Sequence, residues 1–227
     1  MDFLEQYSVS DELYHHGILG QKWGIRRWQN EDGSLTEAGR KRYNYKNNKD
    51  VTIRKGMALD RISLKPIESV KGVPKYVTVD KADTKWEDTF VDVYGKQDGR
   101  NVYKHTYEAM KDIKVSSMNQ SKKLFEKMIQ NPDFDMAAHR QAASHRSATG
   151  VSSSGNIQDD FFKSFGMRED ATKMFIAESM KKGYDAMADV FGVNSGSNTA
   201  TIIFDPDNTL LQTKVKKIYQ SPLQFIF

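Results

Sequence analysis

Histidine, tryptophan and arginine side chains that could bind a partner gather between residues 14 and 30. This run, YHHGILGQKWGIRRWQN, holds two residues of each type and three glycines. Tryptophan and arginine are enriched at the positions that dominate the energy of protein interfaces, and glycine allows a close backbone approach. An alternative is that the two indoles fold back onto the rest of the chain. The predicted partner-binding residues are His15, His16, Gln21, Lys22, Trp23, Arg26, Arg27 and Trp28.

Metal binding and the common catalytic motifs find little support in the sequence. The adjacent side chains of His15 and His16 rarely converge on one ion, and the other three histidines lie apart with no nucleophile partner. The absence of cysteine excludes thiolate zinc sites and cysteine nucleophiles. The serines at 152–154 lack the spacing of a nucleophile elbow, and the sequence contains neither a Walker loop nor a dinucleotide-binding glycine fingerprint. We therefore expect no metal site.

The charge distribution favours binding to a protein. Residues 1–12 carry four acidic and no basic side chains, whereas residues 22–49 carry eight basic against three acidic ones. Such a basic segment can bind an acidic protein surface or a nucleic acid. Nucleic acid is the less favoured partner, because the sequence has no signature of a nucleic-acid-binding fold. The acidic N-terminus does not have the pattern of a secretory signal, and no apolar run reaches the length of a membrane span.

The sequence divides into two predicted parts. Residues 1–49 form a glycine-punctuated Trp/Arg-rich interaction module, in which Thr36 caps a helix that begins at Glu37. The polar run YNYKNNKD marks its end. Residues 50–227 are predicted to form a mixed α+β domain.

Within residues 50–227, hydrophobic patterning predicts the individual elements. A flexible Ser/Gly-rich loop is expected over 144–158. The predicted strands lie within 51–63, 75–79, 101–110, 113–117, 184–192 and 199–204, and the predicted helices within 81–94, 119–131 and 168–182.

The segment HHGILGQKWGIRRWQNEDGSLTEAGRKRY resembles a leader shared by virion-associated and minor structural proteins of tailed phages. In that family the leader precedes C-terminal domains of unrelated type. The resemblance implies a phage capsid, portal or other virion protein as partner, with a host protein as the alternative. It also implies a location in the virion, in the host cytoplasm, or in both.

The remainder of the chain resembles, more weakly, the ADP-ribosyltransferase-like domains of phages and polymorphic toxins. The similarity lies in VTIRKGMALDRIS, YVTVDKADTKWED and KGYDAMADVFG with ATIIFDPDN. It implies that a first-strand arginine, Arg54 or as the less favoured choice Arg61, anchors NAD through its guanidinium. It also implies a catalytic carboxylate. The candidates are Glu178 and Asp205, with Asp185 and Asp189 in the same region.

The sequence departs from that family in one respect that bears on activity. No Glu-x-Glu or Gln-x-Glu pair occurs near the last strands. We therefore expect a non-enzymatic phage structural or virion-associated protein, without a cofactor, that binds another virion component through its N-terminal module. The first alternative is an NAD-dependent ADP-ribosyltransferase-like effector that acts on a host target. The second is a binding-only inhibitor of a host defence complex.

Overall fold

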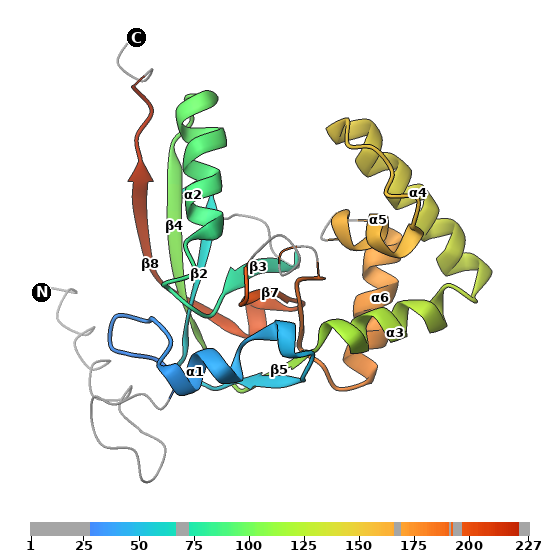
Figure 1. Cartoon of the computed structure of the whole chain (residues 1–227), viewed down its shortest axis with the longest axis horizontal. Coiled ribbons are helices and arrows are strands. Elements are labelled where there is room, and N and C mark those ends of the chain that lie inside the picture. The colour runs from blue at the N-terminus through green and yellow to red at the C-terminus, as the bar shows by residue number, and fades with distance from the viewer. Residues whose placement is uncertain (1–27, 67–72, 166–168, 191, 193–196, 223–227) are drawn as a thin grey trace, which may run out of the picture.

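A computed structural model of the chain describes residues 28–66, 73–165, 169–190, 192 and 197–222. Within these ranges the fold is mixed α+β, as the sequence predicts (Figure 1). The strands are β1 (Val51–Ile53), β2 (Ala58–Ser63), β3 (Lys75–Thr78), β4 (Val102–Ala109), β5 (Ile113–Ser116), β6 (Ala186–Ala188), β7 (Ala200–Ile203) and β8 (Leu210–Tyr219). The α-helices are α1 (Glu37–Arg42), α2 (Lys85–Phe90), α3 (Met118–Met128), α4 (Pro132–Thr149), α5 (Ile157–Lys163) and α6 (Asp170–Lys181). Three further helical elements are the 3-10 helices η1 (Tyr45–Asn47) and η3 (Pro206–Asn208) and the π-helix η2 (Val91–Gln97).

The strands form one sheet in the order β1-β5-β6-β7-β3-β2-β4-β8. All described strand pairs are antiparallel except β5 with β6. The parallel pair requires a long crossover connection, and helices α3 to α6 provide it. These four helices lie together at one end of the sheet, whereas α2 stands beside β2 and β4 (Figure 1).

Alternating side chains of the central strands contribute to two separate hydrophobic clusters. Ala186 and Ile203 belong to the cluster that also holds residues of β1, β2 and the segment before β1. Their chain neighbours Met187 and Ile202 belong to the cluster formed with α3 to α6. Because successive strand residues point to opposite faces, the sheet lies between the two clusters. The second cluster is built on contacting phenylalanine rings, among them Phe125, Phe134, Phe161, Phe162, Phe165 and Phe175.

The described part of the predicted N-terminal module is packed into the first cluster. Leu35, Tyr43 and Tyr45 are almost fully buried there. The side-chain amide of Gln29 donates to the backbone oxygens of Ala58 and Val79, both at 2.8 Å, and so joins the segments of β2 and β3. The boundary predicted after residue 49 therefore falls inside a continuous core, and residues 28–49 belong to the α+β fold. Residues 1–27 lie outside the described ranges.

The predicted helix start at Glu37 is confirmed. The backbone N–H of Gly39 donates to the side chain of Thr36 at 3.1 Å, which makes Thr36 the N-cap of α1. The described strands and helices also lie within or close to most of the ranges predicted from patterning. Three elements, α4, α5 and β8, were not predicted.

The Ser/Gly-rich loop is shorter than the predicted range of 144–158. Helix α4 continues to Thr149, where Gly150 ends it with a φ of 69°, and α5 begins at Ile157. The intervening turn is held by Asp160, which accepts from Ser153 Oγ at 2.7 Å and Ser154 N at 2.9 Å. Burial acts to raise the pKa of Asp160, but these hydrogen bonds and the charge of Arg146 lower it to about 2. The carboxylate of Asp160 thus holds in place a turn that the Ser/Gly-rich composition predicts to be flexible.

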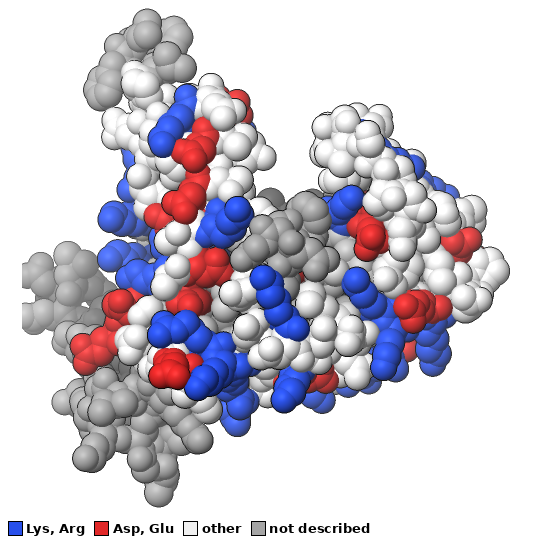
Figure 2. Space-filling view, viewed as in Figure 1, with Lys and Arg blue, Asp and Glu red and all other residues white. Residues whose placement is uncertain are grey.

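The edge strand β8 carries a group of exposed positive charges. Its residues from Leu211 to Lys217 are exposed, and Lys214, Lys216 and Lys217 lie among them. Figure 2 shows basic side chains gathered along this edge of the molecule and acidic side chains along the neighbouring helical column of α2 and η2. No helix in the described ranges is long and apolar enough to cross a membrane.

Candidate functional site

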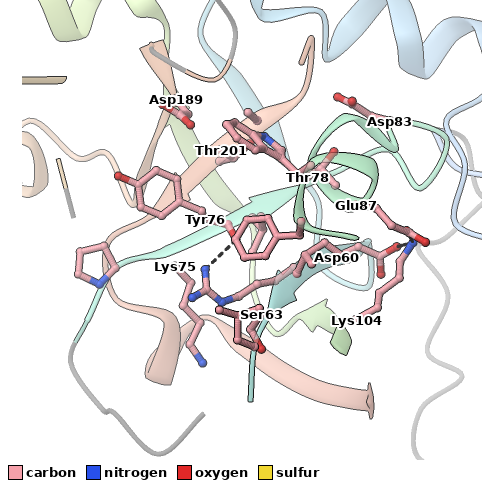
Figure 3. A pocket seen from close by; sticks show the side chains of 18 of the residues that line it. Asp60, Ser63, Lys75, Tyr76, Thr78, Asp83, Glu87, Lys104, Asp189 and Thr201 are labelled. Atoms are coloured by element: carbon pink, nitrogen blue, oxygen red, sulfur yellow. Dashed lines mark hydrogen bonds and ion pairs between the residues drawn. The ribbon is translucent and has the colours of Figure 1, made fainter. Parts of the chain in front are cut away.

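A cavity of about 1000 Å³ lies between helix α2 and strands β2 and β3 (Figure 3). Strand β2 contributes Asp60 to Ser63, and strand β3 contributes Lys75 to Thr78. Helix α2 adds Trp86, Glu87 and Phe90, and the neighbouring strand β7 adds Thr201. Cavities of this size in proteins accommodate small organic ligands and cofactors.

The lining combines positive charge with aromatic surface. Among the described residues that line the cavity, seven are Lys or Arg and four are Asp or Glu. Tyr76, Trp86, Phe90 and Phe162 also line it. Basic side chains bind phosphate and carboxylate groups, and aromatic rings stack on flat ring systems. The lining therefore suits an anionic ligand with a planar ring. The charged residues are Arg61, Lys65, Lys75, Lys81, Arg100, Lys104, Lys163, Asp60, Asp83, Glu87 and Asp189.

Arg61 is held at the wall of the cavity by its strand and by the next one. It lies on β2 opposite His105 of β4. Its Nη1 donates to the backbone oxygen of Tyr76 on β3 at 3.2 Å. A guanidinium fixed in this way can direct a fork of N–H donors towards a phosphate or carboxylate.

Lys104 joins helix α2 to the sheet at one side of the cavity. Its ammonium lies 2.8 Å from Glu87 Oε2 on α2 and 3.2 Å from Asp60 Oδ2 on β2 (Figure 3). Asp60 also accepts from Thr106 Oγ1 at 2.8 Å. Burial acts to lower the pKa of Lys104, but the hydrogen bond to Glu87 and the two carboxylate charges outweigh it and raise the pKa. The lysine is therefore a permanent cation with two partners.

Tyr76 and Asp189 lie close together at another side of the cavity (Figure 3). The hydroxyl of Tyr76 donates to the backbone oxygen of Phe165. Burial raises the pKa of Tyr76, the charge of Asp189 raises it further, and the charge of Arg61 opposes the shift. The phenol thus stays protonated and acts as a hydrogen-bond donor rather than a base. Asp189 is buried, with 3% of its surface exposed.

A third group of polar side chains surrounds Asp83. Its Oδ2 accepts from Ser197 Oγ at 2.6 Å and from Thr199 Oγ1 at 2.8 Å. The hydroxyls of Thr199 and Thr78 are 2.6 Å apart. These bonds connect the segment after β3 to the segment before β7 and hold that rim of the cavity in place.

The two arginines named from the sequence occupy different environments. Arg54 is about half exposed and pairs with Asp112, whose Oδ2 lies 2.5 Å from its Nη1. The hydrogen bond from the backbone of Lys55 is the main cause that lowers the pKa of Asp112. Burial opposes it, and the hydrogen bond and charge of Arg54 lower the pKa further. Arg54 does not line the cavity, whereas Arg61, the less favoured choice, does.

The carboxylates named from the sequence are also distributed over the fold. Glu178 lies on α6 and pairs with Lys181 at 3.4 Å. Asp205 precedes η3 and accepts from Asn208 Nδ2 at 2.8 Å. Neither residue lines the cavity, whereas Asp189 does. Asp189 is thus the one of the four named carboxylates that the fold brings near Arg61.

Of the predicted partner-binding residues, Trp28 alone lies in the described ranges. It is partly buried and packs against the first cluster. The guanidinium of Arg42 lies 4.9 Å from the centre of its ring, within cation–π distance. The indole of Trp28 therefore has a contact within the chain, and Trp23 lies outside the described ranges. The other predicted partner-binding residues, His15 to Arg27, lie outside the described ranges.

Several lining residues carry no local signal in the sequence. Trp86 and Phe90 follow the spacing of an ordinary amphipathic helix, and Lys104 occupies an alternating strand position. Only the pairing of β2 with β3 and β4 brings them to one place. Basic residues on neighbouring strands next to a helix with aromatic residues would have indicated this cavity. The sequence alone does not show which strands are neighbours.

The described residues thus form an α+β domain with a basic, aromatic-lined cavity. They contain no group of three His, Asp or Glu side chains placed to hold a metal ion. No protein-family model matches the chain, and comparison with curated proteins and with solved structures finds no similar protein or fold.

Proposed function

We propose that the α+β domain binds a nucleotide-type anion, with NAD as the ligand that the resemblance to ADP-ribosyltransferase-like domains implies. The observation that carries this proposal is Arg61, fixed at the wall of a cavity of about 1000 Å³ among other cationic side chains. Trp86 and Phe90 supply aromatic surface for a planar ring in the same cavity. A ligand with both phosphates and a planar ring uses both features.

The arrangement of acidic side chains favours binding over catalysis. Asp60 and Glu87 are paired with Lys104, and Asp83 accepts two hydroxyl hydrogen bonds. Carboxylates engaged in this way stabilise the walls of the cavity. Asp189, buried close to Tyr76, is the lining carboxylate we would test first for a role in a transferase.

The binding test is calorimetric titration of the purified protein with NAD, ADP-ribose and ATP. We expect saturable binding of at least one of them, and a loss of tenfold or more in affinity in Arg61→Gln, because a charge-assisted hydrogen bond is worth about 1.5–3 kcal/mol. Arg54→Gln is the matched control, because Arg54 lies outside the cavity. Equal affinities of Arg61→Gln and the unmodified protein would overturn the proposal, and so would the absence of binding at millimolar nucleotide.

Incubation with labelled NAD and host lysate tests the enzymatic alternative. A non-catalytic binder transfers no label. Transfer that is lost in both Arg61→Gln and Asp189→Asn but retained in Arg54→Gln would establish an ADP-ribosyltransferase and replace the binding-only proposal.

We propose in addition that the chain is a virion-associated phage protein whose N-terminal segment binds another virion component. The support is the resemblance of residues 15–43 to the phage leader. Because residues 28–49 are part of the core, the informative deletion removes residues 1–27 alone. Mass spectrometry of purified particles should detect the full chain and miss the truncated one, with melting temperatures unchanged. A full chain that is absent from particles but recovered with a host defence complex would instead support the inhibitor.

A further inference from the structure

A second, smaller cavity lies between helices α3 and α6 and the end of strand β5. Its volume is about 310 Å³, and it shares no described lining residue with the larger cavity. Helices α3 and α6 are neighbours in the helical group beside the sheet (Figure 1). The side chains that carry the argument are three serines, Ser116, Ser121 and Ser179, and three lysines, Lys123, Lys127 and Lys182.

The three serines are buried, yet their hydroxyls have unused hydrogen-bonding capacity. They are 4%, 2% and 1% exposed, in the order Ser116, Ser121 and Ser179. The hydroxyls of Ser116 and Ser121 share one hydrogen bond of 3.0 Å, so the proton of one hydroxyl stays available to a third group. Within the described residues no hydrogen bond involves the hydroxyl of Ser179. Because all three serines line the cavity, their hydroxyls can donate to a group that enters it.

The lysines determine the charge of the ligand that the cavity can bind. Lys123 and Lys127 come from α3, and Lys182 is the C-cap of α6. No Asp or Glu is among the described residues that line this cavity. The charged side chains of the lining are thus all positive and favour an anion, although the hydroxyl of Tyr184, another lining residue, donates to Asp50 at 2.8 Å. The serine hydroxyls favour an anion that accepts several hydrogen bonds.

We propose that this cavity binds a phosphoryl group, with serine hydroxyls donating to its oxygens and the lysines balancing its charge. Its volume of about 310 Å³ exceeds that of the ion alone. Free phosphate and a small phosphomonoester both carry a phosphoryl group, and the experiment below distinguishes these two ligands.

The experiment follows the protein by NMR and by thermal unfolding while inorganic phosphate is added at constant ionic strength, with chloride as the reference anion. The unmodified protein binds phosphate saturably and melts at a higher temperature in its presence. Ser179→Ala weakens binding about tenfold or more, because it removes a hydrogen bond to a charged group. Without phosphate, Ser179→Ala is as stable as the unmodified protein, because the hydroxyl has no described partner to lose.

Lys127→Gln and Lys122→Gln form a matched pair on helix α3. Lys127 lines the cavity and Lys122 does not. The first substitution weakens phosphate binding and the second leaves it unchanged. Equal effects of the two substitutions would mean that the helix attracts the anion through general charge, which overturns the proposal. So would phosphate binding that persists in Ser179→Ala, or a cavity that holds water alone and gives no saturable response.

Two further measurements define the ligand and separate this proposal from the nucleotide site. Tighter binding of glycerol phosphate than of inorganic phosphate assigns the cavity to a phosphomonoester, and the reverse order assigns it to the free ion. Arg61→Gln retains phosphate binding, because Arg61 lines the other cavity. Phosphate binding that is lost in Arg61→Gln would place the anion in the larger cavity and refute the second site.

Discussion

Replacement of Lys104 by methionine is the most direct test of the electrostatics at the larger cavity. The substitution keeps an unbranched chain that is one atom shorter and removes the ammonium between Asp60 and Glu87. The side chains of Lys104 and Asp60 are 16% and 7% exposed, whereas that of Glu87 is 28% exposed. Asp60 then becomes a buried carboxylate whose described hydrogen bond comes from Thr106. Breaking a buried ion pair costs about 3–5 kcal/mol.

Because the group is partly exposed, we expect a loss at or below the lower limit of that range. We expect a decrease of about 2–3 kcal/mol in the free energy of unfolding, measured by urea denaturation, because water reaches Glu87 and screens part of the interaction. For a chain of this size that loss corresponds to a decrease of about 4–12 °C in melting temperature. Asp60→Asn in the Lys104→Met background should recover most of it, because the uncompensated charge is gone while an oxygen can still accept from Thr106.

The control is Lys96→Met, which removes an exposed ion pair with Asp92 on the π-helix η2. The two side chains are 63% and 59% exposed, and an ion pair that water screens in this way contributes little to stability. A Lys104→Met variant as stable as this control would refute a stabilising role for the ion pairs of Lys104 with Asp60 and Glu87. A double variant no more stable than Lys104→Met would show that the loss arises from packing rather than from the unpaired carboxylate of Asp60.

Three other outcomes follow from individual contacts. Because the pKa of Asp160 is about 2, below its ordinary value of 3.8, its stabilising effect is present above pH 4 and lost between about pH 4 and pH 2. Asp160→Asn should be less stable at pH 7 and lose less stability over that interval in urea titrations. Tyr45→Phe removes a buried hydrogen bond of 2.8 Å to Thr201 and should cost about 1 kcal/mol by the same assay. Gly95→Ala places a Cβ 2.9 Å from the ring of Tyr219 and should cost about 1–3 kcal/mol, an effect that Tyr219→Ala should abolish.

Local patterns in the sequence predict much of the secondary structure. The run NVYKHTYEAM was predicted as a strand, and β4 alternates between buried and less buried positions from His105 to Ala109. Strand β8 was missed because its lysine-rich middle is exposed on both faces and therefore has no alternation. Helix α4 was missed because HRQAASHRSAT presents few large apolar residues, although it buries Phe134, Ala138 and Ala142. In both cases tertiary contacts decide a structure that local composition leaves open.

The larger cavity was harder to predict than the strands that form it. Arg54 and Arg61 are seven positions apart in one sequence motif, and the motif alone does not separate them. The turn after β1 directs Arg54 to Asp112, and the pairing of β2 places Arg61 beside Tyr76. The three serines of the smaller cavity come from two helices and a strand end, so no sequence spacing relates them.

The hydrogen bond between Tyr45 and Thr201 also has a consequence for the order of folding. It joins positions 156 residues apart, and the backbone N–H of Tyr45 donates to the oxygen of Asn198. The first-synthesised part of the core thus stays incomplete until the chain beyond residue 201 has left the ribosome. Contacts of such long range slow folding and leave apolar surface open to aggregation in the meantime. We expect the nascent chain to depend on chaperones until β7 is inserted between β6 and β3.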